Sequence, residues 1–322
     1  MTPLVSVIVF TYNQEHLLSE TLNSIVAQNF PIEQYEVLIG EDCSQDQTAL
    51  VAQNFAQRYS HVFAFCHPKN LGILKNYMYL LDRARGKYIM VCAGDDYWLP
   101  GKMQIQTNFM EQNQDVALLY GNFLYLKNGV LEQHQPTFQE LNFETLLFHN
   151  PICAPSTCWQ RTFWEKFKQE VQPEKNGFTV EDWPLWLYLS LCGKIHYLNE
   201  NFCVYRVQSG SASHQKQPSS EHLENFLLRH QTTYEITRIF GEKFSPNKMP
   251  WIEKEIARRL LELYWRHLMH HGLLPKVAKE VQHYAKMYPD LFTSRQKLLL
   301  PFLNSAFLWN NIGSFLKWWR KN

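Results

Sequence analysis

The chain has 322 residues, of which 45% are hydrophobic, 15% aromatic and 19% charged. This composition excludes a disordered, collagen-like or low-complexity polymer, and the length predicts one large domain with an appendage, or two domains. A formal net charge of +1 gives no reason to expect binding to nucleic acid. The charge is uneven, since residues 1–57 hold seven carboxylates and no Lys or Arg, whereas residues 251–322 hold twelve basic and five acidic residues. We therefore expect a cation site near one end and an anionic partner near the other.

Short apolar runs and helix-like segments alternate through the first hundred residues. Buried strands are predicted over 4–10, 36–40, 61–66 and 88–92, with helices over 17–26, 48–59 and 73–84 between them. Such alternation predicts an α/β fold with right-handed crossovers and a mainly parallel sheet flanked by helices on both faces. Further along, residues 116–126 predict additional strand and residues 183–191 an apolar helix.

The last hundred residues have a different, helical character. Helices are predicted over 223–240, 252–271 and 276–288, and their apolar residues at helical spacing are most simply core. A polar stretch rich in Ser, Gln and His, residues 209–220, marks the expected domain boundary.

The cysteines and the amino terminus bear on the cellular compartment. Seven cysteines without CxxC spacing argue against a disulfide framework and against a zinc knuckle. A reducing cytoplasm is the simplest compartment for such a chain. The apolar run 4–10 is too short to span a membrane and no basic residue precedes Arg58, so we expect no signal peptide.

Carboxylates at strand ends are the first sign of chemistry. Glu41 and Asp42 follow the second predicted strand, and Asp95 and Asp96 follow the fourth. Parallel sheets bind ligands at the carboxyl ends of their strands, so these acids are expected to face one crevice. The chain has no GxxxxGK[ST], no GxGxxG after its first strand and no HExxH, which excludes P-loop kinases, dinucleotide oxidoreductases and zincins.

Four strings carry a family resemblance: VSVIVFTYN at 5–13, EDCSQD at 41–46, AGDDYW at 93–98, and Glu181-Asp182. In this order and spacing, over roughly residues 4–210, they resemble the bacterial, nucleotide-sugar dependent, inverting family 2 glycosyltransferases of GT-A fold. The resemblance implies a GT-A-like catalytic domain over 1–212, with a nucleotide-sugar part to about residue 100 and an acceptor part over 101–212. A helical C-terminal region over 221–322 follows it.

The same resemblance implies the activity. It is that of a metal-dependent enzyme that moves a hexose or N-acetylhexosamine from a nucleotide diphosphate donor to a saccharide or lipid-linked acceptor, with inversion. A UDP-sugar is the favoured donor, and bacterial surface polysaccharide synthesis is the implied setting.

By resemblance, Asp42 binds the nucleotide base. A carboxylate only accepts hydrogen bonds. It can therefore accept one from the N3–H group of uracil or thymine, whereas cytosine has no hydrogen on N3 to donate. The alternative is a loop or helix-capping carboxylate. The resemblance also places Glu41 and the residues at the end of the first strand in the nucleotide site; the latter are Phe10, Thr11, Tyr12 and Asn13. Of these, Phe10 and Tyr12 either stack on the base or simply pack the sheet edge.

Asp96 matches the family carboxylate that binds a divalent cation, Mn²⁺ or Mg²⁺, which bridges the donor diphosphate. Such a cation stabilises the charge that the departing diphosphate acquires. Asp95 would contact ribose hydroxyls or a metal-bound water. Two acids also occur in ordinary surface turns, yet like charges at a buried strand end are costly unless a cation compensates them.

Asp182 is the candidate general base. In an inverting displacement the acceptor hydroxyl attacks from the side opposite the leaving diphosphate, and a carboxylate on that side takes its proton. Glu181 would orient the acceptor or support the loop. The alternative is that both acids complement the positive end of the helix that follows.

Three basic or late-loop features complete the donor site that the resemblance implies. Lys75 would face the nucleotide, or else is an exposed helix lysine. Arg206 would hold the diphosphate, because its fork geometry suits phosphate oxygens. Relatives often carry a histidine where Gln208 stands, which puts a third protein ligand to the metal in doubt, and His214 is the other candidate.

Two regions are assigned to the acceptor or to a membrane. Trp98 and Trp183 would form an apolar platform for a sugar ring, or else belong to the core. Residues 298–319 are rich in Leu, Phe and Trp and end in KWWRK, which suits peripheral contact with anionic lipid at the inner face of the cell membrane. Packing against the catalytic domain is the alternative.

Two other functions compete with this one. A sugar nucleotidyltransferase also uses an α/β sheet and carboxylate-held Mg²⁺, but it needs a glycine-rich basic loop after the first strand, and residues 11–20 contain no Gly, Lys or Arg. A noncatalytic carbohydrate-binding or scaffold protein on the same fold is the third hypothesis. Loss of Asp96 or Asp182 would have favoured it, and both are present.

Overall fold

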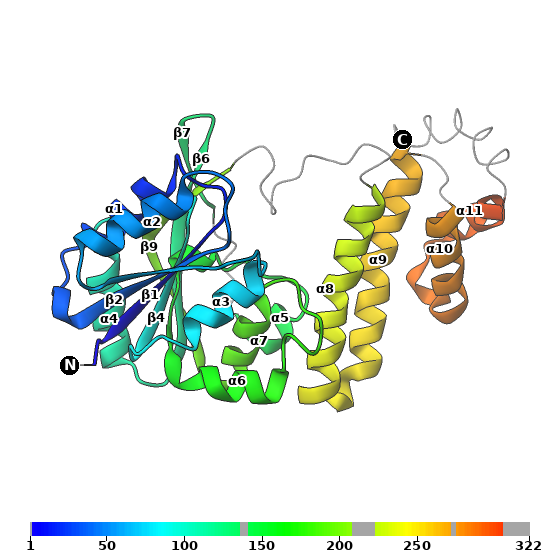
Figure 1. Cartoon of the computed structure of the whole chain (residues 1–322). Helices are drawn as coiled ribbons and strands as arrows, with labels where there is room; N and C mark the ends of the chain where they lie inside the picture. Colours follow the sequence, from blue (N-terminus) through cyan, green and yellow to red (C-terminus); the bar gives the residue numbers. More distant parts are fainter. Residues whose placement is uncertain (1, 136–140, 208–222, 272–274, 305–322) are drawn as a thin grey trace. The chain divides into compact units, whose positions relative to one another are not determined.

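The computed structural model describes residues 2–135, 141–207, 223–271 and 275–304. The chain divides into two compact units, residues 1–216 and 217–322. The first unit is built around a sheet and the second is helical (Figure 1).

Half of the sheet is parallel and follows the predicted alternation of strands and helices. Its strands lie in the order β3-β2-β1-β4 and run parallel to one another; their bounds are β1 (Val5–Thr11), β2 (Tyr35–Glu41), β3 (Val62–Cys66) and β4 (Tyr88–Ala93). The helices between them are α1 (Leu18–Val26), α2 (Thr48–Arg58) and α3 (Ile73–Leu81). The predicted α/β fold with a mainly parallel sheet is confirmed, with element ends within three residues of the expected ones.

The other half of the sheet is mixed and was predicted only in part. The predicted strand over 116–126 is β6 (Val116–Lys127), which pairs in parallel with the long β9 (Lys194–Arg206). Three short strands join them in antiparallel fashion: β5 (Tyr97–Trp98), β7 (Val130–Gln133) and β8 (Cys158–Gln160). Strand β9 was not predicted, because its first eight residues are largely polar and none of them is buried, so they lack the apolar run of a core strand.

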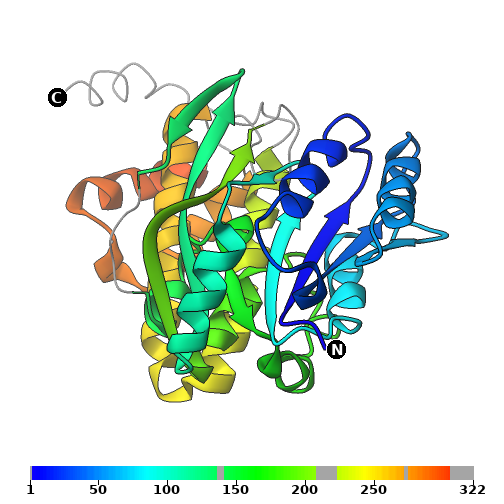
Figure 2. The same cartoon turned by 90° about the vertical axis from the view of Figure 1, so that its left-hand side faces the viewer.

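Helices cover both faces of the sheet. α1, α2 and α4 (Lys102–Gln112) lie on one face, and α3, α6 (Trp164–Val171) and α7 (Trp183–Cys192) lie on the other (Figures 1 and 2). A single helical turn, α5 (Phe143–Leu146), packs against α7. Short 3₁₀ turns connect several elements; in the first unit they are Ile32–Gln34, Ala154–Ser156 and Arg161–Phe163.

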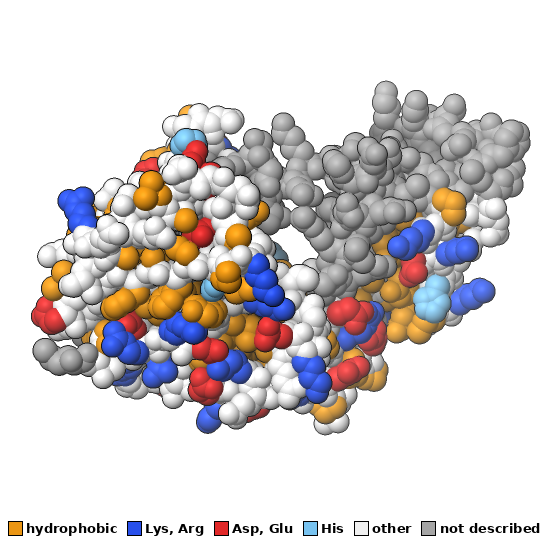
Figure 3. All heavy atoms as spheres, viewed as in Figure 1, with side chains coloured by type: hydrophobic (Ala, Val, Ile, Leu, Met, Phe, Trp, Pro, Cys, Tyr) orange, Lys and Arg blue, Asp and Glu red, His pale blue; other side chains and the backbone are white. Residues whose placement is uncertain are grey.

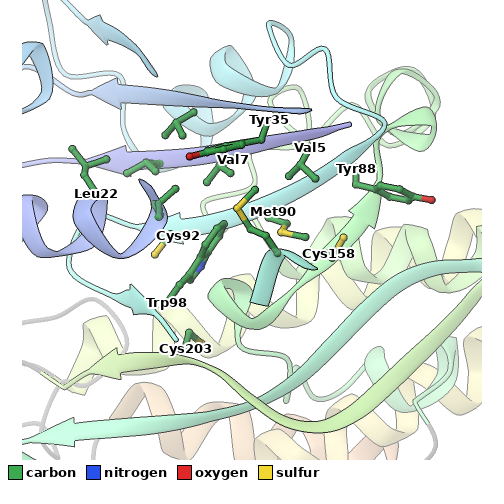
Figure 4. Packing of buried hydrophobic residues seen from close by; sticks show 14 of the residues in the cluster. Val5, Val7, Leu22, Tyr35, Tyr88, Met90, Cys92, Trp98, Cys158 and Cys203 are labelled. Carbon is green, nitrogen blue, oxygen red and sulfur yellow. The ribbon is translucent and has the colours of Figure 1, made fainter. Parts of the chain in front are cut away.

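Alternate residues of the central strands fill two cores. Val7 and Val9 of β1 are fully buried on the face of α1, where they join Leu22 and Met90 (Figure 4). The residue between them, Ile8, is equally buried but belongs to the opposite face. A strand buried on both faces explains why the first run of the sequence is continuously apolar.

The sheet brings three strand ends to one edge. Thr11 at the end of β1 pairs with Glu41 of β2, and Phe10 pairs with Ala93 of β4. The loops that follow β1, β2 and β4 are therefore neighbours at the carboxyl edge, where parallel sheets place their functional residues.

The second unit consists of α8 (Leu223–Phe244), α9 (Met249–His271), α10 (Pro275–Met287) and α11 (Ser294–Leu299), with 3₁₀ turns at Pro246–Lys248, Pro289–Leu291 and Leu300–Asn304. Ile252, Ile256 and Leu260 of the expected apolar stripe are buried in its core. A Cβ on Gly241 would lie 2.7 Å from Ile252 Cδ1, so α8 and α9 approach closely at this glycine. Among the described helices, none is long and apolar enough to cross a bilayer.

Candidate active site

The loops after β1 and β2 are locked together by hydrogen bonds. Asn13 N donates to Ser44 Oγ (2.9 Å), and Gln45 N donates to Asn13 Oδ1 (2.8 Å). Ser44 N donates to Glu41 Oε1 (2.7 Å). Asn13 and Cys43 have φ values of 52° and 62°, a left-handed conformation uncommon outside glycine. The side chains of Glu41 and Asn13 thus fix the two loops in one conformation at the sheet edge, with local backbone strain.

Asp42 fixes the start of α3. Its side chain is buried, with Oδ1 accepting from Leu71 N (2.7 Å) and Oδ2 from Gly72 N (2.9 Å). Gly72 has a φ of 81° and precedes the first residue of α3, so the carboxylate organises a turn that favours glycine. This is the loop role that the sequence offered as the alternative. Each oxygen keeps a further lone pair, so base binding by Asp42 stays a prediction.

The turn after β4 holds two acids side by side, a half-buried Asp95 and a buried Asp96. Asp96 is 2% exposed, and its Oδ1 accepts from Arg206 N (2.9 Å). Burial, reinforced by the charge of Asp95, raises the pKa of the Asp96 carboxyl well above its usual range. Burial also raises the pKa of Asp95. Both acids are therefore costly to ionise together without a cation.

The residue before these acids must be glycine for steric reasons. A Cβ on Gly94 would lie 2.3 Å from Gln14 Oε1 and 2.6 Å from Thr11 Oγ1. Thr11 Oγ1 in turn donates to Gln14 Oε1 (2.7 Å). The loop after β1 and the acidic turn after β4 are consequently packed in direct contact.

Arg206 makes protein contacts in this structure. Its guanidinium group donates to Asp95 O and forms an ion pair with Glu20, and it lies 4.7 Å from the centre of the Tyr97 ring. The diphosphate contact expected of Arg206 would thus have to replace the ion pair with Glu20. Gln208 and His214, the expected late-loop candidates, lie outside the described residues.

The acidic turn fits a divalent cation only as a partial site. Within the described ranges, no group of three His, Cys, Asp or Glu side chains could hold a metal ion. Mg²⁺ and similar ions are commonly held by one or two carboxylates, with substrate phosphates and water as the other ligands. Asp96, with Asp95 beside it, matches that donor set, since the described residues donate to only one of the Asp96 oxygens.

Glu181 and Asp182 differ in their surroundings. Asp182 Oδ1 accepts from Trp183 N (2.5 Å), and Oδ2 accepts from Asn150 Nδ2 (3.2 Å). Burial raises the pKa of Asp182, and these two donors oppose the rise. Burial and then the charge of Asp182 raise the pKa of Glu181 to about 8. The charge of Asp182 thus adds to burial at Glu181, so Glu181 is the acid of the pair that burial and charge together favour in its protonated form.

Two side chains, a half-buried Cys153 and a buried Tyr77, connect these acids to the rest of the edge. A hydrogen bond with Cys203, burial, and the charges of Asp96 and Asp182 all raise the pKa of the Cys153 thiol. Burial and the charges of Glu181 and Asp182 likewise raise the pKa of Tyr77. The ring of Tyr77 packs edge-on against Phe10 with centroids 5.9 Å apart. Asp96 and Asp182, 86 residues apart in sequence, are thus both near enough to Cys153 for their charges to affect its pKa.

The aromatic residues and the lysine expected at the site differ in their exposure. Tyr12 is 45% exposed and Phe10 is half-buried, so Tyr12 offers the larger free ring face at the end of β1. Lys75 is exposed on α3. The expectation of a Trp98 and Trp183 platform is corrected: both are buried, and their indole N–H groups donate to Val91 O (3.3 Å) and Leu146 O (2.7 Å). They pack in the core, as the sequence alternative held.

Four residues of the site were missed by the sequence analysis, namely Gln14, Glu20, Tyr77 and Asn150. Gln14 belongs to the loop after the first strand and could have been found there. The other three lie far in sequence from the residues that they contact or face, namely Arg206 for Glu20 and the pair Glu181-Asp182 for Tyr77 and Asn150, and no spacing pattern marks them. Contacts of this kind depend on tertiary packing.

Comparisons with known proteins agree on one family. A family model described as "Glycosyl transferase family 2" matches residues 6–168. An uncharacterized protein of Mycobacterium tuberculosis is 29% identical over 210 residues, which are 62% of this chain and 58% of that protein. The chain thus spans less than two thirds of the length of this mycobacterial relative.

Two relatives carry informative names. WfgD of Escherichia coli, a UDP-Glc:alpha-D-GlcNAc-diphosphoundecaprenol beta-1,3-glucosyltransferase, is 26% identical over 66% of this chain and 81% of its own length. TarS of Staphylococcus aureus, a poly(ribitol-phosphate) beta-N-acetylglucosaminyltransferase, is 30% identical over 73% of this chain and 39% of its own length.

Solved structures show the same fold. The structure of TarS 1–349 in complex with UDP-GlcNAc matches with a TM-score of 0.60 at 18% identity, over 98% of this chain and 91% of that one. A mannosyltransferase of Pyrobaculum calidifontis in complex with GDP-Man and Mn²⁺ matches with a TM-score of 0.51 at 15% identity, over 98% of this chain and 85% of that one. These likenesses confirm the predicted GT-A-like fold.

Proposed function

The chain belongs to glycosyl transferase family 2, and on that premise we propose that it transfers a sugar from a nucleotide diphosphate donor to a saccharide or lipid-linked acceptor. The observation that supports this proposal is that the ends of β1, β2 and β4 lie side by side in the sheet, with acids in the loops after β2 and β4, while the charges of Asp96 and Asp182 both act on Cys153. Asp42 follows β2, Asp96 follows β4, and Asp182 precedes α7. A general base and a carboxylate for a cation are the two groups that such a transfer requires.

The reaction is an inverting displacement at the anomeric carbon. The acceptor oxygen forms a bond to that carbon while the bond from carbon to the diphosphate oxygen breaks. Asp182 takes the hydroxyl proton, and the neutral Glu181 beside it adds no second charge to the site. A divalent cation held by Asp96 and Asp95 would neutralise the diphosphate when bound.

The donor is proposed to be a UDP-sugar with a hexose or N-acetylhexosamine. Support comes from the names of relatives, since WfgD uses UDP-Glc and the TarS structure holds UDP-GlcNAc. Bacterial surface polysaccharide synthesis is proposed on the same ground, because another relative is the putative teichuronic acid biosynthesis glycosyltransferase TuaG of Bacillus subtilis. The alternative function, a sugar nucleotidyltransferase, has no support, because the loop after β1 contains no Gly, Lys or Arg for a triphosphate.

A thermal-shift panel tests this function. UDP-GlcNAc and UDP-Glc, each with Mn²⁺ at saturating concentration, are expected to raise the Tm by about 5 °C or more, since a ligand at 100 times its Kd stabilises a protein by about 2.7 kcal/mol. The same sugars with EDTA, and GDP-Man with Mn²⁺, serve as controls. Equal shifts with every nucleotide, or none with any, would contradict a UDP-sugar donor.

Peripheral contact with an anionic membrane is proposed for the second unit. Basic residues occupy the exposed face of α10, and Val277, Ala278 and Val281 fill the buried face; the exposed basic residues are Lys276, Lys279, His283 and Lys286. Lys and Arg side chains gather over this helix in the space-filling view (Figure 3). An exposed basic face suits the anionic surface at the inner side of the cell membrane, where a lipid-linked acceptor would be met.

Vesicle binding tests this contact. Changing Lys276, Lys279 and Lys286 to Glu is expected to weaken binding to phosphatidylglycerol vesicles by about 100-fold or more, at about 1 kcal/mol per basic residue. The same change at Lys69, Lys166 and Lys175, exposed lysines of the first unit, is the matched control. Deleting residues 298–322 is expected to weaken binding further. Equal sedimentation of wild type with neutral and anionic vesicles would rule the contact out.

A further inference from the structure

The carboxylate of Asp182 is held by two donors from different segments. Trp183 N belongs to the first residue of α7, and Asn150 Nδ2 belongs to the segment between α5 and the turn at Ala154–Ser156. One donor serves each oxygen, so the carboxylate cannot rotate about its Cβ–Cγ bond without losing a hydrogen bond. Each oxygen retains a lone pair for a proton.

The Asn150 amide is itself fixed in orientation. Ile152 N donates to Asn150 Oδ1 (3.2 Å), which places the amide nitrogen on the side of Asp182. A flipped amide would set an NH₂ group against the Ile152 N–H. It would also turn a carbonyl oxygen toward the Asp182 carboxylate, so both hydrogen bonds would become repulsive.

A second bond ties the same segment to the same helix end. Trp183 Nε1 donates to Leu146 O (2.7 Å), and this indole is buried. Residues 146–150 are therefore attached twice to residues 182–183, once through each side chain. Asn150 therefore contacts Asp182 from a segment that is itself held in place. A residue that sets the geometry of another side chain needs such support.

We propose that Asn150 is a positioning residue for the general base, whose amide holds the Asp182 carboxylate in one orientation and favours its ionised form. The inference rests on the proposed transferase function. It also explains the different states of the two neighbouring acids. Asp182 receives a side-chain donor from Asn150, whereas no side chain of the described residues donates to Glu181, and a donor to a carboxylate favours its ionised form.

The pH dependence of kcat tests the proposal. Asn150→Leu removes the donor at similar size and is expected to lower kcat by about 10 to 100-fold, as loss of a hydrogen bond to a charged group does. The acid limb of the kcat profile should move to higher pH, because a carboxylate that loses a donor is protonated more easily. KM for the donor sugar should stay unchanged. Asn150→Asp, which keeps the acceptor for Ile152 N, should move the limb in the same direction.

Controls separate positioning from folding. Asn142→Ala removes the cap of α5 in the same segment without touching Asp182, and it should leave the pH profile in place. In an Asp182→Asn background, Asn150→Leu should have little further effect on kcat. An unshifted acid limb in both Asn150 variants, with an active wild type, overturns this inference alone. An inactive wild type overturns the proposed function instead.

Discussion

Replacing Asp182 by Asn should lower turnover by about 10² to 10⁴-fold, the range typical of a lost general base, while the donor sugar still binds. The amide retains an oxygen for the Trp183 N–H, so the start of α7 should keep its geometry. What disappears is the carboxylate that is proposed to take the proton of the acceptor hydroxyl. Steady-state kinetics with a radiolabelled UDP-sugar, and calorimetry for donor affinity, measure the two quantities separately.

Glu181→Gln is the matched control for that substitution. Because burial and the charge of Asp182 raise the pKa of Glu181 to about 8, glutamine resembles the protonated acid that is present at pH 7. Turnover at pH 7 should therefore fall at most a few fold. Wild-type turnover in Asp182→Asn would remove that residue from the mechanism. A large loss in Glu181→Gln alone would give the role of base to Glu181.

The parallel half of the fold was predictable because three of its four strands, β1, β2 and β4, are buried on both faces, and the edge strand β3 is still apolar in sequence. Val7, Ile8 and Val9 are all fully buried, so their apolar character is continuous and visible in the sequence. Strand β9 is the opposite case. Its start carries exposed Lys194 and His196, and its place in the sheet is set by pairing with β6 rather than by its own pattern.

Residues of the site divide in the same way. Asp42 and Asp96 were found because they stand in the loops after two predicted strands, which is a local signal, and Asp182 because the pair Glu181-Asp182 belongs to the family resemblance. Asn150 was not, because its contact with Asp182 joins segments 32 residues apart. Trp183 shows the converse error. An aromatic residue next to the acids was predicted to bind a sugar, but its buried indole N–H donates to Leu146 O. Local patterns identify the acids, and packing decides what supports them.

Replacing Asp96 by Ala should abolish the dependence of UDP binding on Mn²⁺. The cation then loses its buried carboxylate ligand, and the diphosphate loses an interaction that is worth several kcal/mol. Isothermal calorimetry of UDP with and without Mn²⁺ measures this directly. We expect the difference in Kd between the two conditions, about 100-fold or more in the wild type, to vanish in the variant.

Asp96→Asn distinguishes loss of the cation from loss of structure. Its side-chain oxygen can still accept from Arg206 N, whereas the negative charge beside Asp95 is gone. The pKa of Asp96 is higher in the folded protein than in the unfolded chain. Ionising this carboxyl therefore lowers the free energy of unfolding, increasingly so as the pH rises above the pKa in the unfolded chain. Asp96→Asn removes that cost and should raise the Tm at pH 7 in EDTA. The same variant should bind UDP equally with and without Mn²⁺. A variant that melts lower in EDTA, or that still responds to Mn²⁺ like the wild type, would show that Asp96 is structural, and the cation would then have to be held elsewhere in the chain.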